Sequence, residues 1–178
     1  MNTINLKEKT FEVFISDTEI AAMVHSIANQ INNSGVKDPL FIAVMNGAFL
    51  FAADVMRKIT ISNAEISFIK LSSYEGTETT GKVDELIGVS DDISGRNIIV
   101  LEDIIDTGIT LEKIISLLKK EEVADIKVAT LLFKPDAYTK DIHIDFIGKS
   151  IPNDFVVGYG LDYDEIGRNL PHIYKLKN

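Results

Sequence analysis

The stretch VLEDIIDTGIT, residues 100–110, joins an apolar run to a helical pattern through a polar loop. The apolar run, residues 97–101, has the continuous hydrophobicity that is typical of a strand covered on both faces of a sheet. After the loop, apolar side chains recur at helical spacing, at Leu111, Ile114, Ile115 and Leu118. The stretch therefore predicts a buried strand, a loop and an amphipathic helix in succession, which is the repeating unit of an α/β fold.

Apolar runs and helical patterns alternate over most of the remaining sequence. Ser16 and Glu19 stand in capping-box spacing before a helical pattern that ends at residues 32–35, and a second helix is expected at 49–59. Extended segments are expected at residues 11–15, 40–45, 64–71, 127–133 and 155–158, with an irregular tail beyond. This alternation predicts a mostly parallel central sheet flanked by helices, and nothing divides residues 1–178 into more than one domain.

Composition excludes several kinds of function. Cysteine is absent, which excludes disulfides, thiolate nucleophiles and cysteine-bound zinc, and favours a cytoplasmic location. The first residues lack the features of a secretory signal, and no apolar run is long enough to cross a bilayer, so no membrane partner is expected. A net charge of −9 disfavours binding to nucleic acid, which requires clustered lysine and arginine.

Glu102 and Asp103 form an acidic pair at the expected carboxyl end of the buried strand. In open parallel sheets, ligands bind in the crevice outside this edge. Neighbouring carboxylates provide hard oxygen acceptors, which suit either a divalent cation held through its waters or the hydroxyl groups of a sugar. The alternative is a solvated strand end that binds nothing.

The loop that follows, from Asp106 to Thr110, predicts a phosphate site. Its backbone amides and the hydroxyl groups of Thr107 and Thr110 converge at the positive end of the next helix dipole. Gly108 permits the positive φ or the close backbone approach that such a loop requires. Taken alone, Asp106 or Thr110 is more often a simple helix cap. The combination of buried strand, acidic pair and D-T-G-x-T favours a ligand site.

At these residues the sequence resembles the type I phosphoribosyltransferases, whose signature is apolar residues, two acidic residues, a short spacer and D-T-G-x-T. The hypoxanthine-guanine branch matches best, over residues 41–174. The resemblance implies a small hood formed from the terminal segments and a mobile lid loop that carries Ser73 and Tyr74. Residues 72–83 lack apolar periodicity, which by itself predicts only a flexible loop or hairpin.

The resemblance implies a role for each part of the motif loop. Glu102 and Asp103 match the acidic pair that contacts the ribose of phosphoribosyl pyrophosphate, directly or through metal-bound water. Asp106 matches the position credited with proton exchange at purine N7, which makes it the candidate catalytic residue. The 5′-phosphate is then expected on the turn formed by Asp106, Thr107, Gly108, Ile109 and Thr110.

Residues farther along the chain match the purine site of the family. Lys134 matches the lysine that donates to the purine 6-oxo group, Phe155 the aromatic residue that stacks on the base, and Val156 the backbone that reads its edge. Without this match, Lys134 would be expected on the surface and Phe155 in the core. Asp162 matches a position beside the purine that binds a second magnesium ion through the pyrophosphate.

The resemblance also implies a pyrophosphate site. Arg168 matches an arginine that contacts the leaving pyrophosphate. Many members have Leu-Lys-Gly in the loop after the early strand, with a non-proline cis peptide whose amide faces the pyrophosphate, and this chain has Met45, Asn46 and Gly47 there. The change removes a positive charge but preserves the backbone amide. The implied magnesium ligands are Glu102, Asp103 and Asp162.

We therefore expect a magnesium-dependent purine salvage enzyme that transfers the 5-phosphoribosyl group from phosphoribosyl pyrophosphate to N9 of hypoxanthine or guanine, giving IMP or GMP and pyrophosphate. The rivals are a uracil-type transferase on the same fold and a nucleotide-sensing regulator that binds RNA. The acidic charge and the lack of a basic cluster disfavour the regulator. A homodimer or homotetramer is expected from the resemblance alone.

Overall fold

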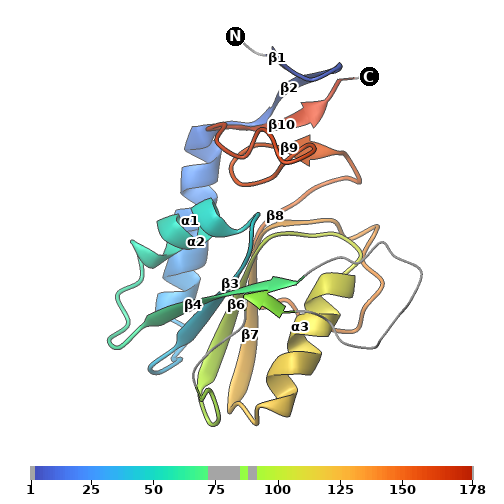
Figure 1. The fold of residues 1–178 in the computed structure, drawn as a ribbon. Coiled ribbons are helices and arrows are strands. Elements are labelled where there is room, and N and C mark those ends of the chain that lie inside the picture. The colour runs from blue at the N-terminus through green and yellow to red at the C-terminus, as the bar shows by residue number, and fades with distance from the viewer. Residues whose placement is uncertain (1–2, 72–84, 88–91, 178) are drawn as a thin grey trace, which may run out of the picture.

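The computed structural model describes residues 3–71, 85–87 and 92–177, whose strands form two sheets (Figure 1). The larger sheet has the strand order β5-β4-β3-β6-β7-β8. Its parallel strands are β3 (Leu40–Val44), β4 (Glu65–Leu71), β6 (Asn97–Ile105), β7 (Asp125–Phe133) and β8 (Phe146–Ser150). At one edge, β5 (Glu85–Ile87) pairs antiparallel with β4. The predicted α/β fold with a mostly parallel sheet is confirmed.

Helices cover both faces of this sheet. Helices α1 (Asp17–Asn32) and α2 (Phe49–Met56) pack on one face, and α3 (Ile109–Lys120) packs on the other. Side chains alternate along β6, so Ile99 and Leu101 join the core beneath α1 and α2, whereas Ile98 and Val100 join the core beneath α3. This two-sided burial explains why the β6 segment is continuously apolar.

The smaller sheet forms the hood, at the top of Figure 1. Its order is β1-β2-β10-β9, with all neighbours antiparallel, and its strands are β1 (Thr3–Leu6), β2 (Lys9–Ile15), β9 (Val156–Val157) and β10 (Ile173–Leu176). Segments from both ends of the sequence therefore build it, as the resemblance implied. The expected irregular tail is confirmed for residues 159–172 and wrong for residues 173–176, because β10 pairs with β2 and Tyr174 packs in a hood core with Phe11 and Val157.

Helix α1 is fixed at its beginning by local and distant contacts. Ser16 and Glu19 form the predicted capping box, in which the side chain of each accepts a hydrogen bond from the backbone of the other. The backbone N–H of Asp17 donates to Nδ1 of His172 at 2.9 Å, which attaches the segment before β10 to the same helix end.

Strand β6 is longer than predicted and ends at Ile105. Glu102 and Asp103 consequently lie within the strand rather than beyond its end.

The expected lid residues Ser73 and Tyr74 lie outside the described residues. In residues 3–71, 85–87 and 92–177, no helix is both long and apolar enough to span a membrane.

Candidate functional site

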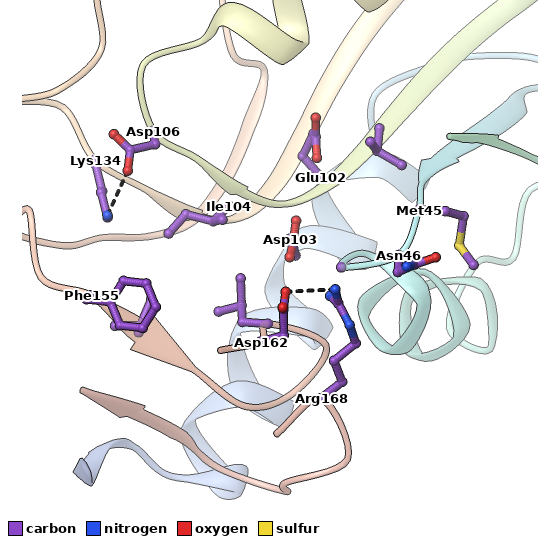
Figure 2. A pocket seen from close by; sticks show the side chains of 14 residues that line it. Met45, Asn46, Glu102, Asp103, Ile104, Asp106, Lys134, Phe155, Asp162 and Arg168 are labelled. Atoms are coloured by element: carbon purple, nitrogen blue, oxygen red, sulfur yellow. Dashed lines mark hydrogen bonds and ion pairs between the residues drawn. The ribbon is translucent and has the colours of Figure 1, made fainter. Parts of the chain in front are cut away.

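A cavity of about 400 Å³ lies between the carboxyl ends of the central strands and the hood (Figure 2). It brings together the predicted residues Asn46, Gly47, Glu102, Asp103, Asp106, Lys134, Phe155, Val156, Asp162 and Arg168. An adjoining hollow of about 100 Å³ is lined by the rest of the motif loop, Thr107, Gly108, Ile109 and Thr110, and shares Glu102 and Asp106 with the cavity. Val44, Ile104 and Leu161 also line the cavity and were not predicted.

The acidic pair is buried. Glu102 is 5% exposed and Asp103 is 9% exposed, so the alternative of a solvated strand end is wrong. Burial raises the pKa of Glu102 well above its usual value, and the neighbouring charge of Asp103 adds to this. Burial likewise raises the pKa of Asp103 to about 6, although its nearby backbone amides and Arg168 act in the opposite direction. Ligands that offer positive charge or hydroxyl donors would stabilise both carboxylates here.

The donor set fits a magnesium ion that shares its ligands with a substrate. Among the described residues, no group of three or more acidic or histidine side chains converges on one point. Mg²⁺ is usually held by one or two carboxylates together with waters and substrate phosphates, so Glu102 and Asp103 are a sufficient protein contribution. Asp162 is already engaged by Arg168 at 2.7 Å and by the backbone N–H of Glu165 at 2.8 Å.

The loop between β3 and α2 approaches the acidic pair closely. The peptide bond between Met45 and Asn46 is cis, as the resemblance implied. A Cβ atom added to Gly47 would overlap the carboxylate of Asp103. Only glycine therefore lets this backbone lie against Asp103.

Within the motif loop, Gly108 is the N-cap of α3 and has a φ of 82°. Gly108 has no side chain to cap the helix, and the only side-chain acceptor at this end among the described residues is Oγ1 of Thr107, which accepts from the N–H of Ile109 at 3.5 Å. The alternative in which Asp106 or Thr110 is a simple cap is therefore wrong. A Cβ atom on Gly108 would lie 2.5 Å from the ring of Tyr138, a neighbour that the sequence did not indicate. Apart from this long bond of Ile109, the first-turn amides of α3 face the adjoining hollow, where they can bind an anion.

Lys134 and Asp106 form an ion pair at the end of β7. Nζ of Lys134 lies 2.8 Å from Oδ2 of Asp106, and the Lys134 side chain is only 9% exposed whereas that of Asp106 is 44% exposed (Figure 2). The expectation of a surface lysine, based on the residue alone, is wrong. The pair presents one cationic donor and one carboxylate acceptor side by side at the cavity.

Phe155 offers an aromatic face to the same part of the cavity. It is 46% exposed, so the expectation of a core residue is wrong. Phe11 and Tyr163 pack against it with ring centroids at 6.3 and 6.0 Å, which fixes the ring within the hood. In Figure 2, Phe155 lies below the pair formed by Asp106 and Lys134. A planar heterocycle on Phe155 would have its edge near that pair.

Arg168 is held rigidly at the other end of the cavity. Its guanidinium donates to the carbonyl of Gly160 at 2.9 Å and pairs with Asp162 at 2.7 Å and with Glu165 at 3.2 Å. The side chain is 20% exposed, so it is not a solvated tail charge. A fixed arginine facing a buried acidic pair suits a ligand that brings both phosphate and metal.

Residues 15–164 match the family model of the phosphoribosyl transferase domain. The hypoxanthine phosphoribosyltransferase of Escherichia coli (strain K12) is 39% identical over 172 residues, which cover 94% of this chain and 96% of that protein. The hypoxanthine-guanine phosphoribosyltransferase of Streptococcus pneumoniae (strain R6) is 39% identical, with 93% of each chain covered. A crystal structure of a hypoxanthine-guanine phosphoribosyltransferase from Bacillus anthracis superposes with a TM-score of 0.84 at 39% identity, covering 94% of this chain and 97% of that one. The chain therefore belongs to the phosphoribosyl transferase domain family, among the hypoxanthine and hypoxanthine-guanine phosphoribosyltransferases.

Proposed function

We propose that the protein transfers the 5-phosphoribosyl group of phosphoribosyl pyrophosphate to N9 of hypoxanthine or guanine, giving IMP or GMP and pyrophosphate. The pair formed by Lys134 and Asp106 beside the exposed ring of Phe155 carries this proposal. A 6-oxopurine has its oxygen and N7 on the same edge, so Lys134 can donate to the oxygen while Asp106 faces N7. The names of the similar enzymes in Escherichia coli and Streptococcus pneumoniae support the same substrates.

The remaining site residues are proposed to hold phosphoribosyl pyrophosphate. The amides of residues 107–110 and the hydroxyl groups of Thr107 and Thr110 would bind the 5′-phosphate at the beginning of α3. Glu102 and Asp103 would accept hydrogen bonds from the ribose hydroxyl groups. The backbone at Asn46 and Gly47, together with Arg168, would bind the pyrophosphate from two sides.

The proposed reaction is a displacement at C1′ of the ribose. N9 of the base forms a bond to C1′ while the bond between C1′ and the pyrophosphate oxygen breaks, and pyrophosphate leaves with that electron pair. Asp106 would accept the proton that the base loses at N7, and Lys134 would hold the 6-oxo group in place. Arg168 would stabilise the negative charge on the leaving group. Bound Mg²⁺ would neutralise charge on the pyrophosphate, with Glu102 and Asp103 as its proposed ligands and with Asp162 proposed to join them by exchanging its contacts with Arg168 and Glu165.

Further proposals rest on the resemblance. Ser73 and Tyr74 are proposed to cover the reacting sugar and exclude water, which would otherwise hydrolyse it.

We also propose a cytoplasmic homodimer or homotetramer, and the exposed Ile66 and Phe68 on one face of β4 support burial against a second copy. One domain over residues 1–178 is supported by a shared core, in which Ile15 and Ile173 of the hood pack with the main sheet.

A substrate panel tests the proposed function. With phosphoribosyl pyrophosphate and magnesium, we expect turnover of hypoxanthine or guanine in an absorbance assay, little turnover of adenine or uracil, and loss of activity when EDTA removes the metal. Xanthine is included because the same edge contacts apply to it. Turnover of uracil alone would favour the uracil-type rival. A salt-sensitive mobility shift of RNA without any base turnover would favour the regulator.

Asn46→Lys is expected to strengthen binding of phosphoribosyl pyrophosphate. The substitution adds a positive charge to the loop that is proposed to contact the pyrophosphate, which at low salt should lower KM by about threefold to tenfold. The effect should shrink as ionic strength rises, because salt screens exposed charges. Steady-state kinetics at two salt concentrations measure it, with the neutral Asn46→Gln as control. An unchanged KM at low salt would place Asn46 away from the pyrophosphate.

A further inference from the structure

Tyr159 connects the hood to α2 through one partly buried hydrogen bond. Its hydroxyl group donates to Oδ2 of Asp54 at 2.6 Å, and the residue is only 7% exposed. Burial and the neighbouring carboxylate of Asp54 both raise the pKa of Tyr159, so the hydroxyl remains a donor. Neither residue lines the cavity. The bond is therefore outside the set of contacts with the substrates.

The two residues belong to segments that carry opposite halves of the proposed pyrophosphate site. Asp54 lies on α2, which begins directly after the loop of Asn46 and Gly47. Tyr159 directly precedes Gly160, and the carbonyl of Gly160 accepts from Arg168 at 2.9 Å. The backbone N–H of Gly160 also donates to the carbonyl of Arg168 at 2.9 Å, so Gly160 and Arg168 move as a unit.

The two halves touch at a backbone contact next to the tyrosine. A Cβ atom added to Gly160 would overlap the carbonyl oxygen of Gly47, and one added to Gly47 would overlap Asp103. Gly160, Gly47 and Asp103 thus form a continuous stack from the hood to β6. The ring of Tyr159 packs in the main core and keeps the hood segment against the main sheet. The directional hydrogen bond to Asp54 fixes the position of this segment along α2.

We propose that Tyr159 and Asp54 are a positioning pair that sets the spacing between Arg168 and the backbone of Asn46 and Gly47. This inference rests on the proposed function, because it assigns that spacing to pyrophosphate. Without the bond, the ring of Tyr159 still packs, but the segment of Gly160 can slide along α2. Binding of the pyrophosphate group should weaken, whereas the purine contacts of Phe155, held within the hood by Phe11 and Tyr163, should not change.

Four variants test the pair in the intact protein. Tyr159→Phe and Asp54→Ala each remove the bond, and their double variant shows whether the two act together. Asp54→Asn is the conservative variant, because its side-chain oxygen still accepts from Tyr159. Arg57→Gln is the matched control, since Arg57 lies 3.7 Å from Asp54 on the solvent side and is 80% exposed.

The readouts are calorimetric titrations of magnesium pyrophosphate and of IMP, with KM and kcat for phosphoribosyl pyrophosphate. We expect Tyr159→Phe and Asp54→Ala to weaken pyrophosphate binding by about threefold to tenfold, as for loss of one hydrogen bond, and to raise KM more than they lower kcat. The double variant should be no weaker than either single one. Asp54→Asn, Arg57→Gln and the affinity for IMP should remain near their original values.

Three results would overturn the inference: unchanged pyrophosphate affinity in Tyr159→Phe, equal losses for pyrophosphate and IMP, or additive losses in the double variant. These outcomes differ from failure of the proposed function. If the unmodified protein turns over no 6-oxopurine, the proposed function fails, and the titrations of magnesium pyrophosphate still report on the pair. If it does turn over a 6-oxopurine while Tyr159→Phe binds pyrophosphate normally, only the positioning role is lost.

Discussion

Asp106→Asn is expected to lower kcat with hypoxanthine by roughly 10²-fold, the size typical for loss of one general acid or base. The amide that replaces the carboxylate cannot accept the N7 proton, although it occupies nearly the same volume. KM for phosphoribosyl pyrophosphate should change much less, because the 5′-phosphate is proposed to bind the amides of residues 107–110 rather than this side chain. Steady-state and single-turnover kinetics separate the two effects.

Asp136→Asn is the control for this substitution. Asp136 is an exposed carboxylate two residues from Lys134, so the variant makes the same change of charge outside the cavity. Asp106 is also the partner of the buried Lys134, so its loss should lower thermal stability as well, and the kinetics are compared at a temperature where thermal unfolding shows both variants to be folded. Full turnover by Asp106→Asn would remove its acid-base role and leave the residue as a partner for Lys134 only.

Gly47→Ala is expected to lower kcat/KM for phosphoribosyl pyrophosphate by about 10²-fold or more, since misplacement of a site by about 1 Å can cost that much. The new methyl group would overlap the carboxylate of Asp103. Either the loop or Asp103 must move, and both are proposed to contact phosphoribosyl pyrophosphate. The backbone at Gly47 does not have the positive φ of Gly108, so the expected cause is this contact rather than backbone strain.

Two measurements check the explanation for Gly47→Ala. Thermal unfolding should show a much smaller effect than kinetics, because the overlap is confined to the cavity wall. Titration of IMP should show that a ligand lacking pyrophosphate still binds, although more weakly if Asp103 has moved from the ribose. Normal kinetics in this variant would mean that the loop has room to retreat and that the close approach is not needed.

The sequence predicted the central strands of the main sheet but not β5 and β8 at its edges, and in the hood it predicted β2 and β9 but not β1 and β10. Strands such as β3 and β6 are buried on both faces, so they consist of consecutive apolar residues that can be recognised in the sequence. Strands β1 and β10 are four residues each and partly exposed, and their pairing depends on β2. No local pattern specifies a partner at the opposite end of the chain, so β10 was expected to be irregular.

The site divides in a similar way. The motif loop was predictable because its residues are contiguous and their spacing has a direct physical meaning. Lys134 and Phe155 were expected at the cavity, which they line, only through the resemblance, and the residues alone predicted the opposite exposure for both. Lys134 is buried because Asp106, from another segment, pairs with it. The bond between Tyr159 and Asp54 could not be predicted either, because it also joins residues from two distant segments of the sequence.

The construction of the hood determines when the purine half of the site is completed during protein synthesis. Strand β2 pairs with β10 through Ile15 with Ile173 and Phe11 with Leu176, so this early strand has its second neighbour only after the last strand has been made. The loop that is proposed to bind the 5′-phosphate, in contrast, lies between β6 of the main sheet and α3. During synthesis, the loop that is proposed to bind the 5′-phosphate can therefore form before β10 has been made, whereas Phe155 obtains its final position only after β10 pairs with β9.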